Sequence, residues 1–248
     1  LDITDEDAVN NLLLKEKFEA VINCAAYTAV DKAESEKELA FKINAIGAAN
    51  LASACKQSNA KFIHISTDFI FEGIVSRPLL ETDSPNPISV YGASKLEGEK
   101  LILQKNSDSL IIRSSWVYSS FGNNFVKTIL RLCNEKKSLN IIYDQIGTPT
   151  YARDLADVIL KIIFSSDWKP GIYNFSNEGV ASWYDFAIAI TEIAKLETKI
   201  IPIETREYPT PAQRPQYSVL NKAKIKAAFD LEIPYWRESL EKCIALLV

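Results

Sequence analysis

Short apolar runs alternate with longer amphipathic stretches through the first half of the chain. The runs near residues 20–26, 61–66 and 109–115 are continuous rather than alternating, which is typical of parallel strands buried on both faces. Between them, apolar side chains recur at helical spacing over residues 36–58 and 90–103. Because such alternation suits β-α-β units, the pattern predicts an α/β fold with a doubly wound, Rossmann-like parallel sheet.

The ends of the elements follow from local signals. Thr4, with Asp7 three residues later, predicts a helix that begins there and runs to about residue 18. After residue 140 the pattern becomes mixed, and we expect residues 1–140 to carry the sheet and residues 141–248 to form a smaller mixed α/β lobe. Within that lobe we predict strands at 139–143, 171–176 and 199–203, and helices at 154–164, 183–196 (capped by Ser182), 221–229 and 235–247.

Composition excludes several classes of protein. Hydrophobic residues make up 47% of the 248 residues, enough for a sizeable core. The net charge of −4 gives no reason to expect nucleic acid or an anionic membrane as a partner, and no apolar run reaches the ~18 residues of a membrane span. The four cysteines show neither C-x-x-C nor zinc spacing, so we expect no metal, free thiols and a cytoplasmic location.

The candidate chemistry begins with Tyr91 and Lys95. Four residues apart in a predicted helix, they share one face, and a nearby ammonium would lower the pKa of the phenol toward working pH. A tuned tyrosine can give a proton to a carbonyl oxygen or take one from an alcohol. Thr67 ends the predicted strand at 61–66, at the edge where open α/β sheets bind ligands. By itself, the pair is more typical of a solvated helix face than of a catalytic site.

Together, the hydroxyl of Thr67, Tyr91 and Lys95 resemble the catalytic set of the extended short-chain dehydrogenase/reductase superfamily. Further segments resemble the dTDP-4-dehydrorhamnose reductase family, and the resemblance runs from the first residue nearly to the last. These segments are residues 23–31, 113–118, 122–127, 144–150, 171–176 and 214–218.

The resemblance implies an enzyme that reduces the C4 ketone of dTDP-4-dehydro-L-rhamnose with NADPH or NADH. Tyr91 would donate the proton, Lys95 would tune Tyr91 and hold the nicotinamide ribose, and Thr67 would bind the carbonyl oxygen. The family also implies that the two lobes interleave and that the protein is a monomer or homodimer; Mg²⁺ is possible but not readable. It further implies cofactor contacts at Asp2, Ile3, Ala26, Tyr27 and Thr28, and substrate contacts at Asp68, Trp116 and Arg214.

Several residues keep two interpretations. Asn44 is either a surface helix residue or a polar group near the active site. His64, the single histidine, is more typical of a packed core residue than of a catalyst. Trp116 is either core packing or an aromatic wall for a sugar ring. Phe69 stands where family members often have tyrosine, which puts one possible hydroxyl contact in doubt.

The glycine-rich turn of a dinucleotide site is not found among the eight glycines. Residues 1–3 resemble the family's segment after the first β-α-β unit, so we expect that unit to be absent before Leu1. We expect a chain beginning at Leu1 to bind NADPH poorly, and cofactor preference is not readable here.

Two other functions remain open. A related branch of the fold serves as a regulatory, binding subunit of methionine adenosyltransferase. Alternatively, the chain is another nucleotide-sugar reductase or an epimerase.

Overall fold

A parallel sheet of four strands forms the centre of the larger lobe. Its order is β1 (Ala20–Asn23), β2 (Lys61–Thr67), β3 (Leu110–Ser114) and β8 (Gly171–Asn174), with every pair parallel. The computed structural model describes residues 1–247. The predicted α/β fold is confirmed, and β8 brings a segment of the second half back to the first sheet. The division near residue 140 stays a prediction.

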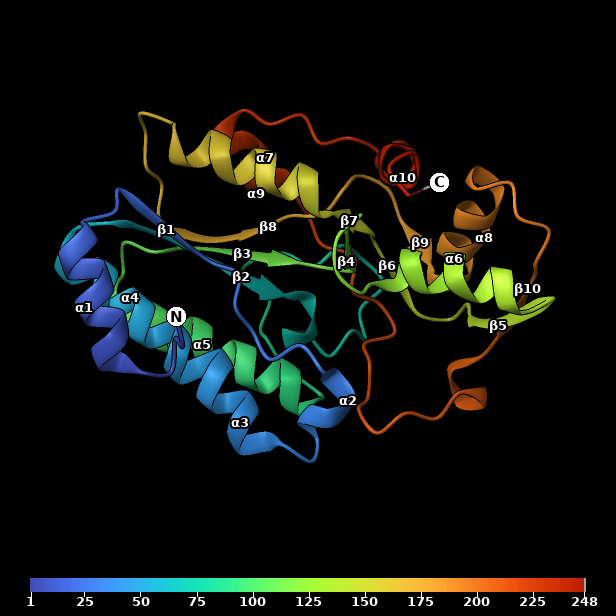
Figure 1. Cartoon of the computed structure of the whole chain (residues 1–248), viewed down its shortest axis with the longest axis horizontal. Coiled ribbons are helices and arrows are strands. Elements are labelled where there is room, and N and C mark those ends of the chain that lie inside the picture. The colour runs from blue at the N-terminus through green and yellow to red at the C-terminus, as the bar shows by residue number, and fades with distance from the viewer. Residues whose placement is uncertain (248) are drawn as a thin grey trace.

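Helices cover both faces of this sheet (Figure 1). On one face, α1 (Glu6–Glu16), α4 (Ala48–Ser58) and α5 (Val90–Lys105) pack against Phe62 and Ile111. On the other, α7 (Ala152–Ile163) and α9 (Ala223–Phe229) pack against Ile63 and Ile112. Successive strand residues therefore point to opposite apolar layers, which explains why these strands read as continuous hydrophobic runs.

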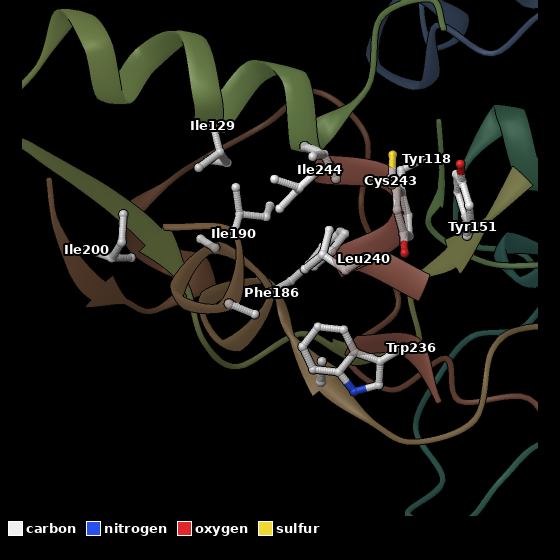
Figure 2. Packing of buried hydrophobic residues seen from close by; sticks show 14 of the residues in the cluster. Tyr118, Ile129, Tyr151, Phe186, Ile190, Ile200, Trp236, Leu240, Cys243 and Ile244 are labelled. Atoms are coloured by element: carbon white, nitrogen blue, oxygen red, sulfur yellow. The ribbon is translucent and has the colours of Figure 1, made fainter. Parts of the chain in front are cut away.

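The smaller lobe lies beyond the end of the sheet and has its own core (Figure 1). Phe186, Ile190, Trp236 and Leu240 lie at its centre and are at most 4% exposed (Figure 2). Two parallel strands flank this core, and two further strand pairs form small sheets separate from the four-stranded one. Its elements are β4 (Val117–Tyr118), α6 (Phe125–Glu135), β5 (Ser138–Ile142), β6 (Ile146–Gly147), β7 (Thr150–Tyr151), β9 (Ala181–Ser182), α8 (Trp183–Ile193), β10 (Lys199–Ile203) and α10 (Trp236–Ile244).

The predicted start of the first helix was wrong by one residue. Asp5 is the N-cap, and its side chain accepts a hydrogen bond from the Ala8 amide; Thr4 instead donates its hydroxyl to Asp2. The helix ends at Glu16, before the predicted residue 18, because Lys17 adopts a left-handed conformation with φ 51°.

The first strand is also shorter than predicted. It ends at Asn23 because the Asn23 side chain accepts the Ala25 amide proton, a local turn that replaces the strand ladder. The helix predicted over residues 36–58 begins as α3 (Lys37–Phe41), after the short α2 (Val30–Ala33). It then widens into a π-helical segment, η1 (Lys42–Gly47), before α4. Such π-helical widenings are frequent at functional sites.

Within residues 1–247 there is no helix with both the length and the apolar character needed to cross a membrane.

Candidate active site

The candidate residues Thr67, Tyr91 and Lys95 lie near the carboxyl end of β2, and their catalytic roles stay predictions. Thr67 is the last residue of β2, and Asp68 opens the short 3₁₀ helix η2 (Asp68–Ile70). Tyr91 lies in the first turn of α5 and makes an edge-on contact with Phe69, with ring centroids 5.5 Å apart. The sequence from strand to helix therefore brings a hydroxyl, a phenol and an amine into one region.

Two glycines let helix α5 approach its neighbours closely. A Cβ at Gly92 would lie 2.2 Å from the carbonyl oxygen of Phe69, and a Cβ at Gly98 would lie 2.2 Å from that of Asn44. Ser89 caps the helix by accepting the Gly92 amide proton at 3.2 Å. The glycines thus fix the distance of Tyr91 from the end of β2 and of α5 from η1.

Asn44 joins the loop after β1 to α5. Its side chain is buried and accepts the Tyr27 amide proton at 2.8 Å. Its amide nitrogen donates to the Tyr27 carbonyl at 3.1 Å and to the Ser94 hydroxyl at 2.9 Å. Ser94 in turn donates to the carbonyl of Tyr91. Of its two interpretations, the structure supports the polar group near the active site.

Lys95 is buried, and the hydrogen bonds of its amine go to β2 rather than to Tyr91. Its Nζ donates to the Ile65 carbonyl oxygen at 2.7 Å and lies 3.1 Å from Nε2 of His64. Burial lowers the pKa of Lys95 to about 8, against the opposite influence of Glu99 and Cys24. Burial also raises the pKa of Tyr91 to about 12, against a hydrogen bond with Thr67. The predicted lowering of the Tyr91 pKa by Lys95 was therefore wrong, because burial of the phenol and the nearby Asp68 raise this pKa and only the Thr67 hydrogen bond opposes them.

Asp68 is a buried carboxylate with incomplete hydrogen bonding. Its Oδ1 accepts the Thr67 hydroxyl proton at 3.1 Å, whereas its Oδ2 is buried and has no hydrogen-bond partner. Burial raises the pKa of Asp68 to about 6, against the lowering effects of Ser218 and Thr67. A carboxyl group with this pKa can exist in either protonation state near neutral pH.

A buried ion pair supports the end of β2 from below. Arg113 on β3 contacts both carboxylate oxygens of Glu99 on α5, with its Nη2 2.7 Å from Oε2. The Ser66 hydroxyl donates to the same carboxylate at 2.5 Å. This network connects β2, β3 and α5. It involves the residue before Thr67 and the residue four positions after Lys95.

Comparison with known proteins agrees with this geometry. The family described as RmlD substrate binding domain matches residues 1–248. The dTDP-4-dehydrorhamnose reductase of Aggregatibacter actinomycetemcomitans is 43% identical over 97% of this chain and 85% of that protein. The chain belongs to the dTDP-4-dehydrorhamnose reductase family. The family resemblance inferred from the sequence motifs is thereby confirmed.

Two solved structures of the reductase family show the same fold. The dTDP-4-dehydrorhamnose reductase from Clostridium acetobutylicum superimposes with a TM-score of 0.96 at 44% identity, covering 100% of this chain and 87% of that one. The enzyme from Bacillus anthracis, solved in complex with NADP, also gives 0.96 at 40% identity, covering 99% and 86%.

In this member of the reductase family, the predicted cofactor residues occupy two places. Ala26, Tyr27 and Thr28 form the loop after β1, where small and partly exposed residues leave the backbone accessible. The Tyr27 hydroxyl donates to Glu36 at 2.5 Å, away from α5. Asp2 is exposed and bonded to Thr4, whereas Ile3 packs against α4 and its carbonyl accepts from Asn50. Their contacts with a cofactor stay predictions.

Trp116 shows features of both interpretations. It stacks on Trp183 with ring centroids 3.7 Å apart, and a Cβ on Gly147 would lie 2.6 Å from its ring. It is only partly buried, however, and its φ of 47° is unusual for a bulky residue. Such backbone strain is concentrated at functional sites, so a sugar contact stays a prediction.

Arg214 lies in the proline-rich loop that crosses from the smaller lobe. Its guanidinium forms a two-pronged ion pair with Asp31 of α2, at 2.8 and 3.1 Å, and also donates to Thr210. Arg214 lines a cleft of about 490 Å³ between this loop and residues 72–74, with Gln145 and Gln216 among the other lining residues. A direct contact with diphosphate stays a prediction.

Two side-chain pairs near the site, Asn23 with His64 and Arg113 with Glu99, were not predicted from the sequence. Asn23 and His64 are register partners on β1 and β2, so their side chains share a face of the sheet. Arg113 and Glu99 were also not considered; the usable signal was a charged residue inside the apolar run of β3. Over the described residues 1–247, no cluster of three or more His, Cys, Asp or Glu side chains could hold a metal ion.

Proposed function

We propose that this protein reduces the C4 ketone of dTDP-4-dehydro-L-rhamnose to give dTDP-L-rhamnose, a precursor of cell-surface polysaccharide. The observation that carries the proposal is the meeting of Thr67, Tyr91 and Lys95 at the carboxyl edge of the sheet. This meeting occurs in a chain that is 43% identical to a dTDP-4-dehydrorhamnose reductase over nearly its whole length.

The proton in this reaction would come from Tyr91. A pKa of about 12 keeps the phenol protonated at working pH, which is the form that a reductase needs. A bound nicotinamide cofactor would supply the hydride to C4. Tyr91 would then protonate the resulting alkoxide, and Thr67 would hold the same oxygen. Because an alkoxide is a stronger base than a phenolate, the transfer is favourable despite the high pKa.

The cofactor would be held by the loop after β1 and by Lys95. The site fits a nicotinamide nucleotide because Ala25 and Thr28 are exposed beside the strand end and the buried Lys95 has only neutral hydrogen-bond partners. The NADP bound to the Bacillus anthracis relative supports NADPH, with NADH as the alternative. Lys95 would contact the ribose with the donor that Ile65 and His64 leave free.

The sugar nucleotide would lie on the side of the smaller lobe. Asp68 and Trp116 would border the sugar, and the cleft lined by Arg214 would take part of the nucleotide diphosphate. The partly exposed ring of Trp116 gives a flat apolar surface suited to one face of a sugar. A cytoplasmic monomer or homodimer is the expected form.

The deciding experiment adds dTDP-4-dehydrorhamnose to the protein with NADPH, and in parallel with NADH, and follows cofactor absorbance and product. We expect one cofactor oxidised for each dTDP-L-rhamnose formed. A changed sugar without net cofactor oxidation would indicate an epimerase. No turnover, together with co-purification of a methionine adenosyltransferase, would indicate a regulatory binding role.

A further inference from the structure

A chain of buried polar groups leads from β1 to the catalytic lysine. Asn23 Nδ2 lies 3.0 Å from Nδ1 of His64, and Nε2 of His64 lies 3.1 Å from Nζ of Lys95. Asn23, His64 and Lys95 are each at most 2% exposed. Because all three side chains are buried, the hydrogen-bonding protons of this series must be shared among these residues and the backbone.

The orientation of the Asn23 amide is set by the backbone. The Ala25 amide donates to Oδ1 of Asn23 at 3.0 Å, so Oδ1 is the accepting end. The other end, Nδ2, therefore faces His64 and can only donate. Reversing the amide would place two donors 3.0 Å apart at Ala25 and leave a buried amide proton without an acceptor, which costs about 1–3 kcal/mol.

This orientation determines the tautomer of His64. Nδ1 accepts from Asn23, so the single proton of the neutral ring must be on Nε2. A proton on Nε2 points at Lys95, and a lysine can accept it only through the lone pair of a neutral amine. The Ile65 carbonyl then takes one of the two remaining amine protons at 2.7 Å.

We propose that Asn23 locks His64 in the Nε2-protonated tautomer, and that His64 is a positioning residue that favours the neutral amine of Lys95. His64 touches neither substrate nor reacting atoms in this scheme; it acts through Lys95. The consequence is a lysine, four residues after Tyr91 on α5, that can change charge near working pH instead of remaining a permanent cation. The proposal rests on the proposed reductase function only for its kinetic consequences.

The groups around Lys95 are consistent with this assignment. Burial is the largest cause that lowers the pKa of His64 well below its ordinary value, so the ring is neutral. Burial is also the largest cause that lowers the pKa of Lys95. Glu99 on the same helix and Cys24 after β1 are the charged or titratable groups that favour the ammonium. Glu99 is already engaged by Arg113, which weakens its influence on Lys95.

The first test reads the tautomer directly. His64 is the single histidine of the chain, so ¹⁵N spectra of histidine-labelled protein report this ring alone. We expect Nε2 to carry the proton and Nδ1 to lack it at every pH at which the protein is folded. A proton on Nδ1, or a charged ring near neutral pH, would overturn the proposal whether or not the protein is a reductase.

The second test changes the group at residue 23 that sets the tautomer of His64. N23D replaces the donor by an acceptor of the same shape, so the proton should move to Nδ1 and Nε2 should accept from the Lys95 ammonium. The pKa of Lys95 should then rise by about one unit or more, and the alkaline limb of kcat should move up by the same amount. N11D, on the exposed face of α1, adds the same charge as a control and should leave both readouts unchanged.

Variants of His64 distinguish the proposal from the alternative in which His64 accepts a proton from a Lys95 ammonium, because the two predict opposite shifts of the alkaline limb of kcat. H64L removes the donor, so on our proposal the alkaline limb also moves to higher pH, whereas H64Q retains an amide donor and should stay close to wild type. If His64 instead accepts from an ammonium, H64L will move the limb to lower pH, and this result would contradict the proposal. Should H64L fail to fold, the wild-type and N23D spectra still decide it.

Discussion

At the residue scale, burial rather than charge sets the chemistry of the candidate site. Burial raises the pKa of Tyr91 to about 12 and lowers that of Lys95 to about 8, and both shifts favour the neutral form. A phenol that stays protonated is suited to giving a proton, and so to reduction more than to oxidation. Oxidation of an alcohol at the same site would need the phenolate as a base, and this environment disfavours the phenolate.

The proton-donor role predicts a specific loss in Y91F. The substitution keeps the ring and its edge-on contact with Phe69 but removes the hydroxyl. General acid catalysis contributes about 10²–10⁴-fold, so kcat should fall by that factor while the Kd for NADPH changes little. Y143F, at an exposed tyrosine outside the site, is the matched control. Turnover of Y91F within about threefold of wild type would remove Tyr91 from the mechanism.

Asp68 predicts a pH dependence of stability. Its pKa is raised in the folded protein from an ordinary 3.8 to about 6, so the folded state binds the proton more strongly than the unfolded chain. The free energy of unfolding therefore falls as pH rises between these two values. Two pKa units set an upper limit of about 3 kcal/mol. D68N should lose this dependence.

Unfolding in urea at several pH values checks the effect. Asp83 gives the comparison of opposite sign, because its ion pair with Arg77 lowers its pKa to about 2 and its contribution is lost as pH falls. If wild type and D68N keep a constant difference in unfolding free energy from pH 4 to pH 6.5, the Asp68 assignment is wrong.

At the element scale, close packing of α5 against η1 decides the geometry. Replacing glycine by alanine inside a helix normally gains about 1 kcal/mol. In G98A the new Cβ would meet the backbone oxygen of Asn44 at 2.2 Å, whereas in G47A it would meet the movable side chain of Ile3 at 2.6 Å. We expect G98A to destabilise by roughly 2 kcal/mol and G47A by much less. Equal effects in thermal unfolding would show that α5 can shift freely.

The buried pair between Arg113 and Glu99 gives a second test at this scale. R113M leaves a carboxylate that is 2% exposed without its cation, and such a loss costs about 3–5 kcal/mol. The double variant with E99M removes the orphaned charge and should regain part of that loss. Urea unfolding of both variants measures it; a double variant no more stable than R113M would exclude an uncompensated charge as the cause.

Periodicity located the parallel strands and most helices because burial on both faces leaves a direct trace in the sequence. The limit of β1 and the π-helical widening at η1 leave no such trace. The first depends on a local turn made by the Asn23 side chain, and Asn44 of η1 bonds to backbone 17 residues away. The positions of Thr67 at the end of a strand and of Tyr91 and Lys95 on one helix were predictable from their order along the chain, and their catalytic roles stay predictions. The contact of Asn23 with His64 required the register of β1 and β2.

At the scale of the whole molecule, the loop of residues 205–216 connects the two lobes. Arg214 anchors it to α2 of the larger lobe through Asp31, and the loop lines the cleft next to Gln145 of the smaller one. Because both partners are partly exposed, the ion pair should contribute at most about 1 kcal/mol to stability. Its effect should instead be on how well the cleft is formed for a ligand.

R214K tests this division between stability and binding. Lysine keeps the charge but loses the planar fork that contacts both oxygens of Asp31. We expect KM for the sugar nucleotide to rise about tenfold, which corresponds to ~1.4 kcal/mol, with kcat and thermal stability little changed. R206K is the control, because Arg206 lies on the same loop but is 81% exposed and pairs only with Glu204. If R214K and R206K raise KM equally, the loop does not depend on its contact with α2, and the two lobes form the cleft without it.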